Sequence, residues 1–187
     1  MRKRLFVAVN LPDDIKSAIS RQIDDWRPLF SNEIRFMPAD NWHLTITFLD
    51  YQEDEYIPAI VGAMEEVAET SLSADINFTS FAYGPTEKRP RMIWLMGDEM
   101  ADRWLGDIKN KLEVALIGRG VMFNQERKPP KTHITLARFQ DGTRNNLPKI
   151  AGVANINFLA TGLDLMESTL KRSGAEYDEL FSVDFND

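Results

Sequence analysis

A six-residue pattern that occurs twice, 90 residues apart, most constrains what this chain can fold into. The first copy, from His43 to Phe48, reads HLTITF, and the second, from His133 to Arg138, reads HITLAR. Histidine and threonine alternate with apolar residues in both copies, which is the two-residue period of a half-buried β-strand. We therefore expect two strands that each bury an apolar face and present a histidine and a threonine on the other face.

The elements predicted around these strands follow the same order in both halves of the chain. The periodicity predicts strands at 5–9, 43–48, 76–83, 92–96, 133–138, 156–166 and 176–183, with helices at 12–29, 57–68, 98–118 and 146–151. This order favours an internal duplication, with half-repeats of roughly 1–90 and 91–187 in a single bilobal domain. A pseudo-twofold between the halves would make the histidine strands face one cleft.

The composition limits the cellular compartment and the kinds of chemistry that we expect for this chain. Of the 187 residues, 43% are apolar and 27% are charged, as in ordinary soluble globular proteins. The chain has no cysteine, which excludes disulfides, a thiolate nucleophile and cysteine-ligated zinc. A formal charge of −7 argues against a broad nucleic-acid surface but leaves room for a small basic site. The apolar run after the basic start is too short for a signal peptide, so we expect a cytoplasmic protein with no membrane partner. We also expect a monomer.

Two histidines brought together could exchange protons with one substrate. Histidine is the side chain whose ordinary pKa lies nearest neutrality, so His43 and His133 are the catalytic candidates, one as general acid and the other as general base. Thr45 and Thr135 would donate hydroxyl hydrogen bonds to an anion lying between the imidazoles. Such a set suits displacement at phosphorus, where catalysis rests on positioning and charge stabilisation.

An arginine would complete a phosphate site, because the guanidinium group matches phosphate oxygens in pairs. The candidates are Arg138, at the end of the second motif, and Arg91, just before the predicted strand at 92–96. Arg138 lies five residues after His133, and this odd step turns it away from the histidine face of a regular strand. Either a β-bulge or the end of the strand redirects Arg138, or Arg91 contacts the phosphate instead.

Other interpretations of these residues remain open. A strand histidine is often a structural hydrogen-bonding group, and a metal site with Asp50 or Asp141 lacks a recognised ligand spacing and a third ligand. Two basic clusters are either solvated surface or a site for a polynucleotide backbone: Lys88, Arg89 and Arg91, and Arg127, Lys128 and Lys131. Five aromatic residues could stack a base, although strand parity directs Phe48 to the core: Trp42, Phe48, Tyr83, Trp94 and Phe139.

Five segments together resemble a known family. They are RLFVAVNLP near the start, then HLTITFL, RPRMIWL and HITLAR, and LMESTLKRSGAEYDELFSVDF near the end. In kind and order they resemble the two-histidine (2H) phosphoesterases, and within them the LigT-like RNA 2′,3′-cyclic phosphodiesterases, also called RNA 2′-5′ ligase-like proteins. The resemblance spans nearly the whole chain. It differs from the family pattern at Asp50, where glycine is common, and at Thr132, where proline is common.

The resemblance implies an α+β fold in which two antiparallel sheets form a central groove with helices packed outside. It also implies hydrolysis of 2′,3′-cyclic phosphates, on RNA ends or cyclic nucleotides, to 2′-phosphomonoesters without metal or cofactor. His43 would then protonate the leaving 3′ oxygen and His133 would activate water, while Thr45, Thr135 and Arg138 hold the phosphate. A noncatalytic module that binds nucleotides or RNA ends, and a 2′-5′ RNA ligase, are the alternatives.

Overall fold

Two antiparallel sheets and three α-helices make up the described part of the computed structural model, which comprises residues 1–30, 34–86, 88–125, 129–139, 147–150, 153–171 and 174–186. The first sheet has the strand order β3 (His43–Glu53), β1 (Arg2–Asn10), β8 (Gly162–Lys171) and β9 (Gly174–Asp184). The second has the order β2 (Ile34–Phe36), β6 (His133–Phe139), β5 (Met92–Gly97), β4 (Ala74–Gly84) and β7 (Val153–Ala160). The predicted α+β class with two antiparallel sheets is confirmed.

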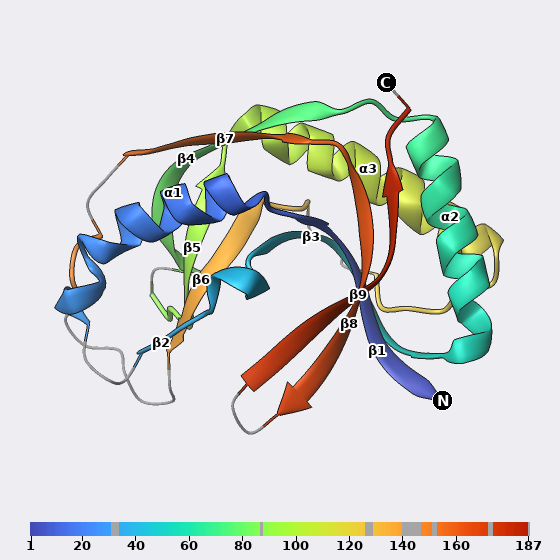
Figure 1. Cartoon of the computed structure of the whole chain (residues 1–187), viewed down its shortest axis with the longest axis horizontal. Coiled ribbons are helices and arrows are strands. Elements are labelled where there is room, and N and C mark those ends of the chain that lie inside the picture. The colour runs from blue at the N-terminus through green and yellow to red at the C-terminus, as the bar shows by residue number, and fades with distance from the viewer. Residues whose placement is uncertain are drawn as a thin grey trace.

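Both sheets take strands from both halves of the sequence. The first sheet joins β1 and β3 to the C-terminal β8 and β9, whose hairpin projects beyond the rest of the molecule in Figure 1. The histidine-bearing strands β3 and β6 belong to different sheets, yet they contact each other. The two motifs therefore meet where the sheets adjoin. The half-repeat boundaries at 1–90 and 91–187 stay a prediction.

The helices cover the sheets from outside (Figure 1). Helix α1 (Asp13–Asp24) contacts β7, while α2 (Ile57–Glu69) and α3 (Glu99–Gly118) pack against each other at the other end of the molecule. The predicted N-cap of α3 is present, because the Asp98 carboxylate accepts a hydrogen bond from the Ala101 N–H at 2.8 Å. None of the helices in the described residues is long and apolar enough to cross a bilayer.

Several predicted boundaries were wrong. The helix expected over 12–29 ends at Asp24, and a separate 3₁₀ turn at Arg27–Leu29 follows it. The single strand expected over 156–166 is two strands, β7 and β8, which belong to different sheets. The short strand β2 was missed. The helix expected at 146–151 has both ends outside the described residues, and residues 147–150 are not helical.

A β-bulge in β3 reverses the expected direction of the side chains that follow it in this strand. Thr45 lies opposite Ala8 and Thr47 lies opposite Val7, so Ile46 is an extra residue in the ladder. Beyond the bulge, Thr47 is buried and Phe48 is 49% exposed. The prediction that Phe48 faces the core was therefore wrong, because strict alternation fails wherever one strand carries an additional residue.

The second motif contains the same irregularity. In β6, Thr135 pairs with Trp94 and Ala137 pairs with Ile93, which leaves Leu136 as the extra residue. The first six residues of both strands share one burial order, in which the first and third are half-buried, the second, fourth and fifth are buried and the sixth is exposed. Arg138 is that sixth residue, so the bulge turns it toward the face that carries His133.

A second irregularity in β3 explains why glycine is common in the family at the position that Asp50 occupies here. Asp50 adopts a left-handed backbone conformation with φ of 55°, next to a register shift opposite Leu5 and Phe6. Glycine has no Cβ and adopts this conformation without steric cost, whereas L-residues lose about 1 kcal/mol or more. The Asp50 carboxylate accepts a hydrogen bond from the Asn124 amide at 2.9 Å, which partly offsets that cost.

We expect Asp50→Gly to be more stable than Asp50→Ala by about 1 kcal/mol, because only alanine places a Cβ in the left-handed conformation. Both variants lose the carboxylate and its bond to Asn124, so their difference isolates the backbone effect. Urea unfolding of the two variants would measure it. Equal free energies of unfolding would contradict the interpretation of Asp50 as a strained glycine position.

Candidate active site

His43 begins β3 and is held by neighbours from both ends of the sequence. Its Nδ1 lies 2.9 Å from the Asn41 carbonyl oxygen, which can only accept, so Nδ1 carries the proton. The ring lies 4.8 Å from the Phe6 ring and 5.1 Å, edge-on, from the Tyr177 ring of β9. These contacts fix the imidazole and leave Nε2 as the nitrogen that can exchange a proton with a substrate.

The surroundings of His43 strongly favour its neutral form. Burial lowers the pKa of His43 from its ordinary 6.5 to about 4, and the bond to the Asn41 carbonyl acts in the opposite direction. The charges of His133 and Arg138 lower this pKa further. In the protein without ligand, His43 is therefore uncharged at neutral pH.

His133 begins β6 in the corresponding way. Its Nδ1 donates to the Lys131 carbonyl oxygen at 2.7 Å, which again assigns the proton to Nδ1 and the exchange of protons with a substrate to Nε2. The indole of Trp94 lies 4.2 Å from the imidazole, with 36° between the ring planes. Each histidine is thus bonded to the carbonyl two residues before it, and each is flanked by an aromatic ring.

Two other candidate residues lie within electrostatic range of His43. His133 and Arg138 both act on the pKa of His43, although they come from the other sheet. Thr45 and Thr135 are half-buried and lie two residues beyond their histidines, before the bulge of each strand. These five side chains offer two proton-transfer groups, two hydroxyls and one guanidinium, which is the chemistry of a phosphate site.

Arg91 occupies a different position. It is exposed, its N–H donates to the Gly84 carbonyl at 2.6 Å and its carbonyl accepts from the Phe139 N–H at 2.9 Å. The groups that shift the pKa of His43 include Arg138 and do not include Arg91. Between the two candidate arginines, the charge effect on His43 therefore favours Arg138.

Known proteins match this chain in sequence and in fold. A sequence model of the family described as LigT like phosphoesterase matches residues 9–94. The chain is 27% identical over 185 residues to the RNA 2′,3′-cyclic phosphodiesterase of Thermus thermophilus, covering 95% of this chain and 87% of that protein. The crystal structure of TT0787 of the same organism superposes with a TM-score of 0.80 at 26% identity, over 97% of each chain. The chain is therefore similar to the LigT-like phosphoesterases in sequence and in fold. E. coli LigT complexed with 3′-AMP is also similar, with a TM-score of 0.78 and 26% identity over the full length of both chains.

Several residues that shape the site could not be recognised from the sequence. Asn41 and Lys131 act through their backbone carbonyls, which carry no signal in residue type. Tyr177 reaches His43 from β9, although 134 residues separate them in the chain. The hairpin that carries Tyr177 is also bonded to the turn just before the first motif, because the Asn41 amide donates to the Ala175 carbonyl at 2.9 Å.

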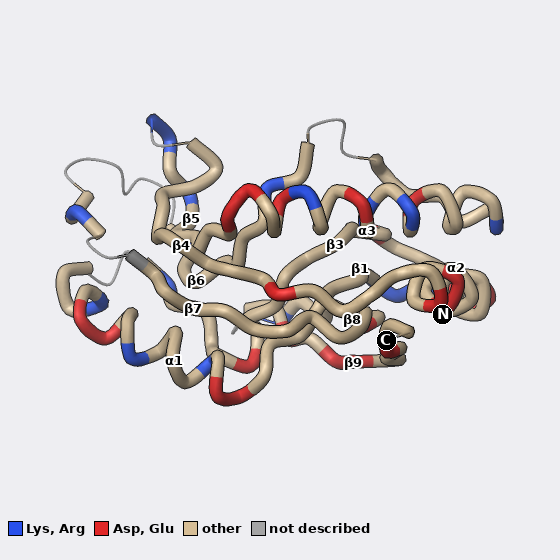
Figure 2. The backbone as a smooth tube through the Cα atoms, turned by 90° about the horizontal axis from the view of Figure 1, so that it is seen from above, with Lys and Arg blue, Asp and Glu red and all other residues tan. Residues whose placement is uncertain are grey.

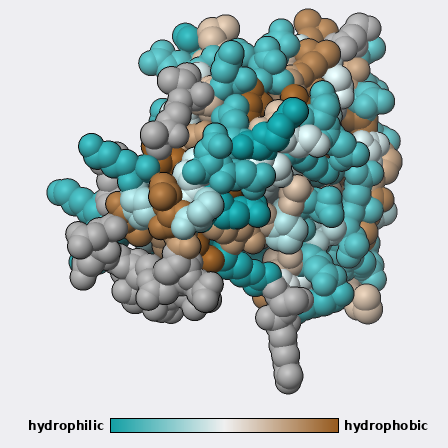
Figure 3. All heavy atoms as spheres, turned by 60° about the vertical axis from the view of Figure 1, so that its left-hand side comes forward, coloured by the Kyte–Doolittle hydropathy of each residue, from teal (hydrophilic) through white to brown (hydrophobic). Residues whose placement is uncertain are grey.

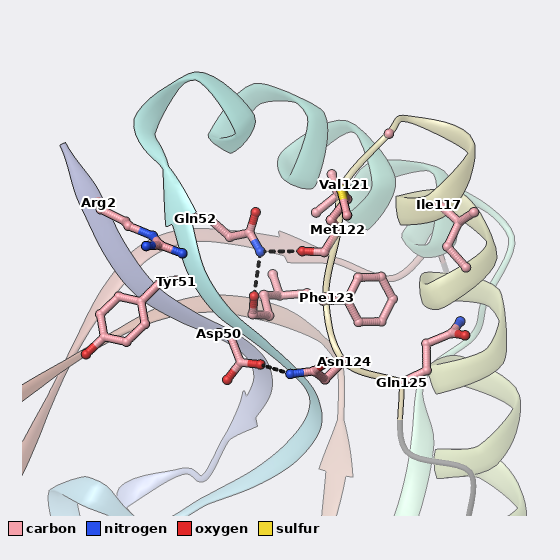
Figure 4. Close-up of a pocket in the computed structure, with 12 residues that line it drawn as sticks. Arg2, Asp50, Tyr51, Gln52, Ile117, Val121, Met122, Phe123, Asn124 and Gln125 are labelled. Carbon is pink, nitrogen blue, oxygen red and sulfur yellow. Dashed lines mark hydrogen bonds between the residues drawn. The ribbon is translucent and has the colours of Figure 1, made fainter.

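One cavity of the described structure lies away from the histidines. It has a volume of about 540 Å³ and is formed between the second half of β3 and the segment after α3, as Figure 4 shows. The side chain of Gln52 bonds there to the Leu49 and Met122 carbonyls, and Asp50 bonds to Asn124. Neither histidine lines this cavity, and three of its polar side chains, those of Asp50, Gln52 and Asn124, are already hydrogen-bonded within it. We therefore place the candidate active site at the histidines.

Because the folded pKa of His43 is depressed, the protein should lose stability in acid. The unfolded chain takes up a proton on His43 near pH 6.5 while the folded protein resists until about pH 4. The contribution of neutral His43 to the free energy of unfolding is complete above pH 6.5 and is lost as the pH falls to about 4. The loss amounts to about 3 kcal/mol. Urea unfolding at pH 7 and pH 4 should show that His43→Gln loses about 3 kcal/mol less than the wild type. An equal loss in both proteins would contradict the assignment.

Proposed function

We propose that this protein hydrolyses the 2′,3′-cyclic phosphate of RNA ends or nucleotides to a 2′-phosphomonoester by acid–base catalysis between His43 and His133. The observation that carries the proposal is that two imidazoles from different sheets interact electrostatically while each has its Nδ1 bonded to a backbone carbonyl. The charge of the Arg138 guanidinium also acts on His43. The relative named RNA 2′,3′-cyclic phosphodiesterase and the relative crystallised with 3′-AMP support the substrate class.

The reaction can be written with all atoms in place. His133 Nε2 accepts a proton from water as the water oxygen bonds to phosphorus, and the bond from phosphorus to the 3′ oxygen breaks. His43 Nε2 gives its proton to that 3′ oxygen, so that the product carries a 3′-hydroxyl and a 2′-phosphate. Thr45 and Thr135 donate hydrogen bonds to the nonbridging oxygens, and Arg138 compensates the charge that develops on them.

The lowered pKa of His43 constrains this sequence of events. A neutral His43 cannot act as an acid, so the anionic phosphate must raise its pKa when the substrate binds, as an opposite charge does at close range. The same phosphate offsets the positive charge of Arg138, which lowers the pKa of His43 in the free protein.

The exposed ring of Phe48 offers a surface for the nucleobase. It lies 6.0 Å from the Phe6 ring, which in turn contacts His43, so these rings form one aromatic cluster beside the imidazole. Stacking on an aromatic side chain is tolerant of base identity. The site should therefore accept cyclic phosphates that carry different bases.

Incubation with nucleoside 2′,3′-cyclic phosphates and short RNAs ending in a cyclic phosphate, in excess chelator, tests the proposal. We expect turnover to a 2′-phosphomonoester that the chelator does not abolish, identified by chromatography against 2′- and 3′-phosphate standards. A 3′-phosphate product would reverse the acid and base roles. Tight binding without turnover would instead support a noncatalytic nucleotide-binding module.

A further inference from the structure

A carboxylate lies behind the second motif, and no carboxylate of the described residues accepts the equivalent backbone N–H behind the first. Asp102 lies near the start of α3 with its side chain only 17% exposed. Its Oδ1 accepts the Thr132 N–H at 2.7 Å, and its Oδ2 accepts the Lys131 ammonium group at 2.7 Å. Burial opposes ionisation of Asp102, but these hydrogen bonds outweigh it and hold the pKa of the carboxyl below its ordinary value.

The N–H that Asp102 binds and the carbonyl that His133 binds belong to one peptide group. The Lys131 carbonyl and the Thr132 N–H are the two ends of a planar amide, and fixing one end fixes the direction of the other. A continuous series of hydrogen bonds therefore runs from the Asp102 carboxylate through the Lys131–Thr132 peptide group to Nδ1 of His133. Hydrogen bonds in series polarise one another, so the carboxylate makes the Lys131 carbonyl a stronger acceptor.

The segment that carries this peptide group is held on its other sides as well. Thr132 is fully buried, and its carbonyl accepts the Gly97 N–H at 2.8 Å. A Cβ at position 97 would lie 2.7 Å from the Thr132 side chain, so glycine is needed for this close approach. The end of β5 and the first turns of α3 thus fix the residues just before His133.

The first histidine has a different arrangement. Nδ1 of His43 is bonded to the Asn41 carbonyl, and the N–H at the other end of that peptide group, from Trp42, donates to the Ala39 carbonyl at 3.0 Å. That acceptor is a neutral carbonyl, whereas the acceptor behind His133 is an ionised carboxylate. The two motifs are alike in sequence, but their histidines are polarised to different degrees.

We propose that Asp102 is a positioning residue that orients and polarises His133 through the Lys131–Thr132 peptide group, and that it distinguishes the base from the acid in the histidine pair. A carboxylate that strengthens the Nδ1–H bond keeps His133 in the tautomer with Nε2 unprotonated and makes that nitrogen a better proton acceptor. Proline at position 132 has no N–H, so this connection depends on the threonine of this chain. The role in the reaction rests on the function proposed above.

Imidazole NMR can test the connection without reference to activity, because the chain contains only two histidines. In ¹⁵N-labelled protein, the His133→Ala spectrum assigns the signals of both rings. We expect His133 of the wild type to be a single Nδ1–H tautomer with a strongly downfield Nδ1 proton. In Asp102→Ala this proton should shift upfield and the Nε2–H tautomer should become populated, while the His43 signals stay unchanged. In Asp102→Asn the amide oxygen can still accept from Thr132, so the tautomer should be kept with a smaller upfield shift.

Kinetics on adenosine 2′,3′-cyclic phosphate supply the second readout. Asp102→Ala should lower kcat about 10–100-fold with little change in KM, as loss of a group that orients a functional histidine does, and Asp102→Asn should restore part of kcat. Lys131→Met removes the ammonium group but keeps the carboxylate and the peptide, so it should retain most of kcat. Asp107→Ala is the matched control, because Asp107 is an acid of α3 paired with Lys111 at 2.9 Å that makes no contact with this segment among the interactions described.

These results separate the proposal from its premise. An Asp102→Ala protein that keeps the single tautomer, the downfield proton and a kcat within twofold of wild type would overturn it. If Asp102→Ala does not fold, Asp102→Asn decides, and an unshifted Nδ1 proton with unchanged kcat would then be the contrary result. A wild type without any turnover would refute the proposed function, while the NMR spectra would still show whether Asp102 orients His133.

Discussion

Replacing either histidine with glutamine or alanine is expected to lower kcat for cyclic phosphate hydrolysis by about 10²–10⁴-fold, the usual contribution of a general acid or base. Because both groups act in one transition state, the double variant should lose little more than the worse single variant. Steady-state kinetics in excess chelator measure the effect. Glutamine at position 43 keeps a donor near the Asn41 carbonyl, so it should preserve the fold better than alanine.

The leaving group separates the roles of the two histidines. A p-nitrophenyl ester of a nucleotide needs no protonation of its leaving oxygen, so His43→Gln should recover most of its activity on this substrate. His133→Gln should stay inactive, because activation of water is still required. Recovery by the His133 variant instead would exchange the acid and base assignments. Unfolding temperatures close to that of the wild type would show that neither loss of activity reflects loss of fold.

Replacing Arg138 with glutamine should lower kcat/KM by about 10²–10³-fold, in the range found when a group that stabilises developing negative charge is removed. The bulge at Leu136 turns this guanidinium to the histidine face, and its charge acts on the pKa of His43. Arg138→Lys should recover only part of the loss, because an ammonium group lacks the paired donors that match phosphate oxygens.

Arg91→Gln is the matched control for Arg138. Both residues are exposed arginines at the same end of the second sheet, where Met92 pairs with Arg138. We expect the Arg91 variant to stay within a few-fold of wild type on a mononucleotide, since Arg91 is not among the groups that influence His43. A larger loss in Arg91→Gln than in Arg138→Gln would transfer the phosphate contact to Arg91.

For the proposed RNA substrate, the distribution of charge favours one direction for a longer chain. Acidic residues lie along β9, while basic residues are found at the outer end of β5, as Figure 2 shows. The surface seen in Figure 3 is mostly hydrophilic, with hydrophobic residues exposed in limited areas. Lys88 and Arg89 are exposed beside Arg91, whereas Arg127 and Lys128 lie outside the described residues. A backbone leaving the site toward the acidic hairpin would be repelled, so the β4–β5 end is the favourable direction.

The parts of the fold that the sequence predicted well are those with strong local signals. Apolar periodicity located α2 and α3, and Asp98 marked the start of α3 because its carboxylate satisfies an unpaired N–H there. Local signals failed between Ile156 and Met166, where one apolar run serves two sheets with a change of partner at Thr161. Which strand an apolar segment joins depends on residues distant in the sequence, so periodicity alone cannot locate such a boundary.

By itself, the sequence determined the chemical groups of the candidate site and their local order. Two histidines, each followed by a threonine on an apolar strand, indicated a phosphate-directed acid–base pair, and the flanking motifs indicated the family. The tertiary structure decided how those groups face and what holds them. The bulges that redirect Phe48 and Arg138 arise from pairing with β1 and β5. Tyr177 contacts His43 from β9, and Asp102 of α3 binds the Thr132 N–H next to His133. Such contacts depend on strand pairing and packing between distant segments, and these interactions leave no periodic trace in the sequence.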